Sequence, residues 1–203
     1  MCRNPSPPTT DFTLSAWVDE SVIVGGPLHA DGCYTLAAAV TDTAAADGMR
    51  DVLRDLTLFK AGRLHWVDES AKRRDHIIAS VAALDLAAVV TVGSPVHRAK
   101  QERARRCCLE RLLYELGLMG VTDVCLESRT ATPDRRDLRL VDSARDKGLM
   151  PKGLKVGFAR PRDEPMLWIA DAVAGAVTAS RLGEPRWLVV MTEILTQHEV
   201  DVR

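Results

Sequence analysis

Strand-like and helix-like segments alternate along the second half of the chain, and this order restricts the fold more than any other feature. Leu86 to Val92 is a continuous apolar run typical of a buried strand, and Ala99 to Leu118 then has helical spacing with leucines on one face. The alternation continues through a strand at Val121 to Glu127, a helix at Asp134 to Lys147, a strand at Gly153 to Ala159 and a helix from Asp163 or Glu164 to about Leu182. Such alternation predicts parallel strands with helices on the faces of the sheet.

The first half of the chain predicts a different arrangement. Thr13 to Val18 and Cys33 to Val40 read as two strands, separated by Gly25, Gly26 and Pro27 and by an Asp31-Gly32 turn, which favours a β-hairpin. Residues 43–84 read as a helical insertion between this hairpin and the third strand. We expect a disordered tail over residues 1–12 and a single domain over 13–203, in which Trp187 to Ile194 forms a further strand or a packed tail.

Composition excludes several classes of protein. The net charge of −1 gives no global positive field, so nucleic-acid binding would need a local basic face. The five cysteines include no CxxC pair and the histidine spacing fits no zinc motif, which argues against a disulfide framework or a zinc site. No apolar run is long enough to span a membrane and the start lacks a signal pattern, so we expect a cytoplasmic protein with no membrane partner.

One acid stands out before any family is considered. Asp171 lies among Trp168, Ile169, Ala170 and the following run of small apolar residues in the last predicted helix. A lone carboxylate in such a helix costs free energy unless it is hydrogen-bonded, paired or bound to a metal. The sequence therefore predicts either a functional acid here or a buried acid bonded to a backbone amide or an arginine.

The predicted order of elements and three short motifs carry a family resemblance. An opening hairpin, a third strand, then helix–strand–helix–strand–helix is the order of the ribonuclease H-like fold. WVDES at 17–21, LHW at 64–66 and IADAVAGAV at 169–177 resemble motifs of the bacterial domain-of-unknown-function family 3800. The sequence departs from the family at Val22, where glycine is expected, and at Glu127, where aspartate is frequent.

The resemblance implies a carboxylate site. Ribonuclease H-like nucleases hold two divalent cations about 4 Å apart between carboxylates, and Asp19, Glu127 and Asp171 match those positions, so Mg²⁺ or Mn²⁺ is the expected cofactor. His65 is then a proton shuttle or a phosphate contact, while Lys60 and Arg129 are expected to bind substrate. A fourth acid is usual in such enzymes, and three residues remain open for that role: Glu20, Glu102 and Glu110.

Three functions follow from this sequence. The first is a metal-dependent nuclease or related phosphodiester hydrolase, with nucleic acid as its partner. The second is a catalytically inactive ribonuclease H-like module that binds nucleic acid or protein, which the altered glycine and the missing fourth acid favour. The third is a transposase or integrase remnant. The arginines at 103, 105 and 106 are either a solvated helix face or a nucleic-acid contact.

Overall fold

Six strands form one sheet in this computed structural model, which describes residues 12–24, 32–57 and 62–202. The strands are β1 (Leu14–Ile23), β2 (Cys33–Asp42), β3 (Ala87–Ser94), β4 (Val121–Glu127), β5 (Lys155–Ala159) and β6 (Leu195–Asp201). Their order across the sheet is β5-β4-β1-β2-β3-β6. The first three strands pair antiparallel, β4 and β5 run parallel to β1, and β6 runs parallel to β3. The predicted ribonuclease H-like fold is confirmed.

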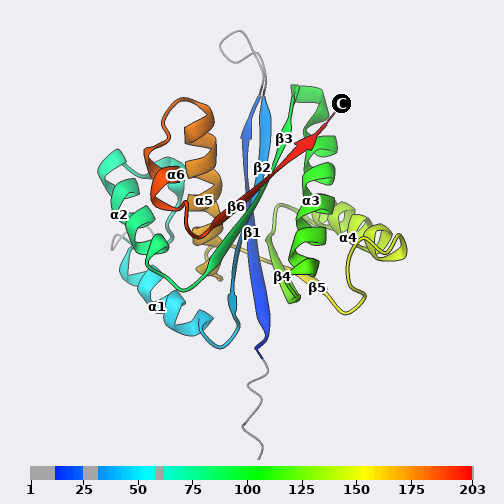
Figure 1. The fold of residues 1–203 in the computed structure, drawn as a ribbon, viewed down its shortest axis with the longest axis horizontal. Coiled ribbons are helices and arrows are strands. Elements are labelled where there is room, and N and C mark those ends of the chain that lie inside the picture. Colours follow the sequence, from blue (N-terminus) through cyan, green and yellow to red (C-terminus); the bar gives the residue numbers. More distant parts are fainter. Residues whose placement is uncertain (1–11, 25–31, 58–61, 203) are drawn as a thin grey trace, which may run out of the picture.

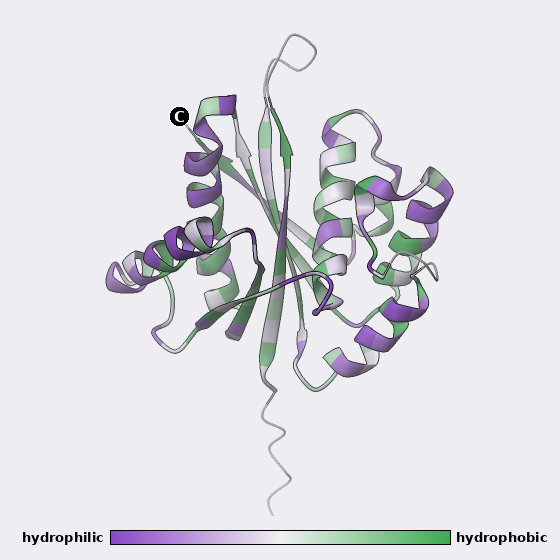
Figure 2. Ribbon diagram, turned by 180° about the vertical axis from the view of Figure 1, so that it is seen from behind, coloured by the Kyte–Doolittle hydropathy of each residue, from purple (hydrophilic) through white to green (hydrophobic). Residues whose placement is uncertain are grey.

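Helices cover both faces of the sheet (Figure 1). They are α1 (Ala46–Asp55), α2 (Ala71–Ala82), α3 (Gln101–Leu118), α4 (Ala131–Asp146), α5 (Met166–Arg181) and α6 (Arg186–Val190), with short 3-10 turns at Trp66–Asp68 and Arg98–Lys100. One face packs against α5, beside which α1, α2 and α6 lie, and the other against α3 and α4. Apolar side chains form one buried cluster on each face, and hydrophilic residues lie along α4 and the outer side of α3 (Figure 2). No helix in the described part of the chain is both long and apolar enough to cross a membrane.

The C-terminal segment differs from the prediction. The apolar run from Trp187 to Ile194 is not a strand: it contains most of the short helix α6 and the turn after it. The sixth strand follows it, at Leu195–Asp201, with a mostly polar sequence and much of its length exposed. An edge strand buries little side-chain surface, so it lacks the apolar alternation by which strands are recognised.

Several predicted boundaries also shift. The fourth helix begins at Ala131 instead of Asp134, and the first helix begins at Ala46 because β2 continues to Asp42. The predicted tail, apart from residue 12, and most of the predicted hairpin turn lie outside the described residues.

The length of β1 decides where the site forms. We expected this strand to end near Asp19, but it continues to Ile23 and pairs with β2 along its whole length. Its pairing with β4 on the other side stops at Val18 and Leu126. Asp19 therefore lies inside β1 yet at the end of the β1–β4 ladder.

Gly175 on α5 admits the side chain of Trp66. A Cβ atom added at Gly175 would overlap three atoms of the Trp66 ring. Trp66 is buried, and its ring also packs edge-on against Trp187 with centroids 5.1 Å apart. The glycine thus allows the segment before α2 to pack closely against α5.

Gly175→Ala should lower the free energy of unfolding by about 1–3 kcal/mol, because the rigid indole cannot yield to the added methyl group. Gly48→Ala is the matched control: Gly48 lies in α1 with open space around its Cβ position, so this change should stabilise the protein by about 0.5–1 kcal/mol through helix propensity. Urea unfolding of the two variants measures both effects. A Gly175 variant as stable as the control would contradict the packing role.

Candidate carboxylate site

Acids from three elements line one small hollow at the end of β4. Asp19 of β1 and Glu127 of β4 directly follow Val18 and Leu126, the last pair of the parallel ladder. Asp171 lies on α5, and His65 precedes the Trp66–Asp68 turn. The hollow has a volume of about 180 Å³, and its lining is completed by Val18, Glu20, Leu36, Arg105 and Arg129. The structure thus brings together the four residues that the sequence predicted as catalytic.

Asp171 is tied to the segment that carries His65. One of its oxygens, Oδ2, accepts a hydrogen bond of 2.7 Å from the backbone N–H of Trp66 and lies 3.1 Å from Nδ1 of His65. The hydrogen bond with Asp171 raises the pKa of His65, against the opposing effect of burial. The buried acid predicted in α5 therefore does bond to a backbone amide, and it also orients a histidine that is about one-third exposed.

Asp19 is the most perturbed acid of the site. Burial raises its pKa well above the ordinary value of 3.8, and a hydrogen bond with Glu127 raises it further. The negative charges of Glu127 and Asp171 act in the same direction, while Arg105 opposes them. Asp19 and Glu127 are thus neighbouring carboxylates, and both burial and the adjacent negative charge disfavour the ionised form of Asp19.

A buried cation network lies on the other side of β1. The Arg105 side chain is buried, and its guanidinium donates to Glu20, to Tyr34 Oη and, through Nη2 at 2.8 Å, to Asp137. Burial raises the pKa of Tyr34, so its hydroxyl stays protonated and donates to Glu20. Arg129 reaches Asp137 from the opposite side at 3.3 Å.

The sequence interpretation of Arg105 was therefore incomplete. Arg103 and Arg106 are exposed, but Arg105 lies on the same helical face as Leu109 and Leu112 and is 4% exposed. Its position four residues before Leu109 was the available signal, because residues at i and i+4 share a helix face. The role of Asp137, three residues before Leu140 on the buried face of α4, could have been found in the same way.

The other candidate residues are engaged in ion pairs or lie outside the described part of the chain. Arg129 lines the hollow, but its guanidinium already pairs with Glu102 at 2.9 Å and with Asp137. Of the three acids considered as a fourth ligand, Glu20 is bound by Arg105, Glu102 by Arg129, and Glu110 lies 3.8 Å from Lys147 on the outer side of α3. Lys60 lies outside the described residues.

The acids do not converge on a single point. Within residues 12–24, 32–57 and 62–202, no group of three or more His, Cys, Asp or Glu side chains is placed to hold a metal ion. Asp171 directs one oxygen toward Trp66 and His65, which leaves the adjacent pair Asp19 and Glu127. This pair fits a hard cation by donor type, because Mg²⁺ is commonly held by one or two carboxylates and completes its shell with water and substrate phosphates.

Comparisons with known proteins give only weak likenesses. Ribonuclease HII of Archaeoglobus fulgidus, solved in complex with PCNA, is 15% identical over 89% of this chain and 77% of that chain, with a TM-score of 0.48. Ribonuclease H2 of Pyrococcus horikoshii OT3 is 16% identical over 87% and 75%, with a TM-score of 0.47. No protein-family model and no curated protein sequence matches the chain. Membership of family 3800 thus stays a prediction, and neither likeness bears on substrate or metal.

Asp19→Asn should stabilise the metal-free protein at pH 7. Folding raises the pKa of Asp19, so the folded state holds this proton more tightly than the unfolded state does. The free energy of unfolding therefore falls as the pH rises from 3.8 through the folded-state pKa. Removing the charge should raise the free energy of unfolding by about 1 kcal/mol or more at neutral pH. Below pH 3.8, where Asp19 is protonated in both the folded and the unfolded state, the substitution should have no such effect.

Urea unfolding in EDTA across this pH range measures the difference. Asp55→Asn, which alters an exposed acid of α1, is the control and should show no such pH-dependent gain. An Asp19→Asn variant that is equally stabilised at all pH values would show that the charge is not the cause.

Proposed function

We propose that the carboxylate site hydrolyses phosphodiester bonds with the help of a divalent cation. The observation that carries the proposal is the meeting of Asp19, Glu127, Asp171 and His65, from four separate segments, around one small hollow. Carboxylates crowded together at a free energy cost are typical of sites that act on a charged ligand.

The carboxylate pair would hold the cation. The negative charges of Glu127 and Asp171 disfavour the ionised form of Asp19, and a bound cation would neutralise the same repulsion. When bound, Mg²⁺ or Mn²⁺ supplies Lewis-acid stabilisation of charge on the phosphoryl oxygens and lowers the pKa of bound water. Asp171 binds Trp66 and His65 through Oδ2 and lies close enough to influence Asp19 electrostatically.

His65 would supply the proton for the leaving oxygen. Its Nδ1 is occupied by Asp171, so Nε2 is the ring atom left for proton transfer to a substrate. The raised pKa of His65 favours the protonated form that a general acid needs. Asp171 acts here as the orienting partner, as carboxylates commonly do for catalytic histidines.

A non-catalytic binding module is the second candidate. The observation that favours it is the engagement of Asp171 Oδ2 by the Trp66 amide, a contact that can be purely structural. In that case the raised pKa of Asp19 reflects its burial and its acidic neighbours without any catalytic role, and the fold serves as a scaffold for recognition.

The proposal predicts cation binding that depends on the carboxylate pair. Titration of the metal-free protein with Mn²⁺ in a calorimeter should give binding to the wild type, with proton release because Asp19, whose pKa is raised, must be deprotonated to bind the cation. Asp19→Asn and Glu127→Gln should each weaken or abolish this binding. Asp55→Asn is the matched control and should bind like the wild type. Binding that survives in both site variants would place the cation elsewhere.

The proposal also predicts a specific loss at His65. His65→Gln should lower the rate of oligonucleotide cleavage by about 100-fold or more, because a general acid typically contributes at least that factor. Cation binding should be retained, since His65 is not placed in the carboxylate pair. A substrate with a better leaving group, such as bis(p-nitrophenyl) phosphate, should rescue much of the loss. An equal loss with both substrates would rule out proton donation to the leaving oxygen.

A further inference from the structure

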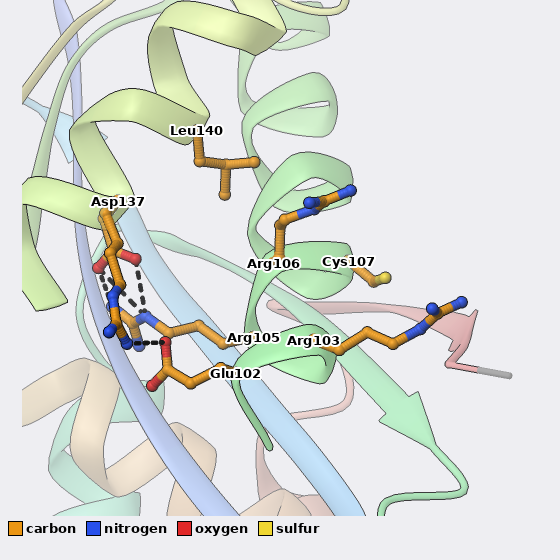
Figure 3. A pocket seen from close by; sticks show the side chains of 8 residues that line it. Glu102, Arg103, Arg105, Arg106, Cys107, Asp137 and Leu140 are labelled. Atoms are coloured by element: carbon orange, nitrogen blue, oxygen red, sulfur yellow. Dashed lines mark hydrogen bonds and ion pairs between the residues drawn. The ribbon is translucent and has the colours of Figure 1, made fainter. Parts of the chain in front are cut away.

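A long groove runs between α3 and α4, on the face of the sheet opposite α5. It consists of two adjoining hollows with volumes of about 500 and 430 Å³, which share Arg106, Arg136 and Leu140. We call this the α3–α4 groove. Figure 3 shows its first hollow, with Arg105 reaching toward Asp137 while Arg103 and Arg106 extend away from that network.

The α3–α4 groove is basic although the chain is not. Its described lining includes six basic and three acidic side chains, whereas the whole chain has a net charge of −1. Each of the three acids already faces a cation: Asp137 is bound by Arg105, Glu102 by Arg129, and Glu110 lies near Lys147. The excess positive charge of the groove is thus not neutralised from within it.

Two arginines of the α3–α4 groove lack an acidic partner among the described residues. Arg106 makes no hydrogen bond or ion pair with another described residue, and Arg139 donates to the backbone oxygen of Arg135. Both side chains are exposed. Their guanidinium groups are therefore available to an anion, and the planar fork of arginine matches phosphate oxygens in a bidentate manner.

Both helices of the groove contribute arginines one helical turn apart. Arg103 and Arg106 are three residues apart on α3, and Arg136 and Arg139 are three apart on α4. Residues three apart share one face of a helix, so both walls of the groove present positive charge. No aromatic side chain lines the groove among the described residues. The groove therefore offers no aromatic platform for bases, and its guanidinium groups favour contacts to a phosphate backbone.

The α3–α4 groove adjoins the carboxylate site. Arg105 lines both the first hollow and the hollow that holds Asp19. A chain of phosphates seated along α3 and α4 would therefore lie next to the hollow that holds the acids, with the buried, ion-paired Arg105 between the two.

We propose that the α3–α4 groove binds the phosphodiester backbone of a single nucleic-acid strand and guides it to the carboxylate site. The inference rests on the proposed function for the direction of the strand, but the binding itself does not require cleavage. Because the contacts go to phosphates, binding is independent of base sequence and falls steeply with salt.

Fluorescence anisotropy in EDTA tests the groove without catalysis. A labelled single-stranded oligonucleotide of mixed sequence should bind the wild type, and Arg106→Glu with Arg139→Glu should weaken binding about tenfold or more. The slope of log affinity against log salt should fall by roughly 0.7 for every phosphate that the variant no longer binds. The matched control is Arg54→Glu with Lys72→Glu, exposed positions on α1 and α2 beyond the opposite face of the sheet, which should bind like the wild type.

The outcomes separate this inference from the proposed function. If oligonucleotide binding depends on the two groove arginines but no preparation cleaves any diester, the groove stands and the nuclease proposal fails. Hydrolysis of bis(p-nitrophenyl) phosphate should be the same in the wild type and the groove variant. Equal oligonucleotide affinity of the two proteins would overturn the inference, and so would binding of polyglutamate with no binding of the oligonucleotide, which would indicate an acidic polypeptide as the ligand.

Discussion

The buried guanidinium of Arg105 is the interaction on which the rest of the structure depends. It joins β1, β2 and α4 through Glu20, Tyr34 and Asp137, and so fixes one helical layer to the centre of the sheet. A buried charge is tolerated only when all of its hydrogen-bonding capacity is used, and removal of one partner leaves another charge unpaired. Its position also affects the carboxylate site, because Arg105 lines the same hollow as Asp19 and its charge opposes the rise in the pKa of Asp19.

On the α5 face of the sheet, by contrast, apolar packing holds the helical layer in place. Trp66 occupies the space left by Gly175, and its backbone amide holds Asp171. Because His65 directly precedes Trp66 in the chain, the contacts of Trp66 with α5 also fix the position of His65. The histidine is therefore placed by a tryptophan that never enters the hollow. The helical insertion is thus attached to α5 at the point where it orients His65.

Much of the site could be predicted because it follows from topology. Asp19 and Glu127 follow apolar runs in strands that topology makes neighbours, and parallel neighbours bring such positions to one edge. Asp171 was conspicuous because an acid in an apolar helix needs a partner. Nothing in the residue pattern identifies that partner as the Trp66 amide, because the contact depends on how the insertion folds back onto α5. Two other features stayed hidden: β6, whose polar residues lack the alternation that identified the other strands, and Arg105, whose burial depends on the leucines that share its face of α3.

The short length of β4 has a structural consequence beyond the chemistry of its last residue. Beyond Glu127, β1 has a partner only on its β2 side, so the sheet no longer separates the two helical layers there. Val18, Glu20 and Arg105 from one layer and Asp19, His65 and Asp171 from the other line the same hollow for this reason. The hollow is therefore an opening in the sheet, lined by residues from both of its faces. Two more residues of strand after Glu127 would shut it, with every carboxylate still in place.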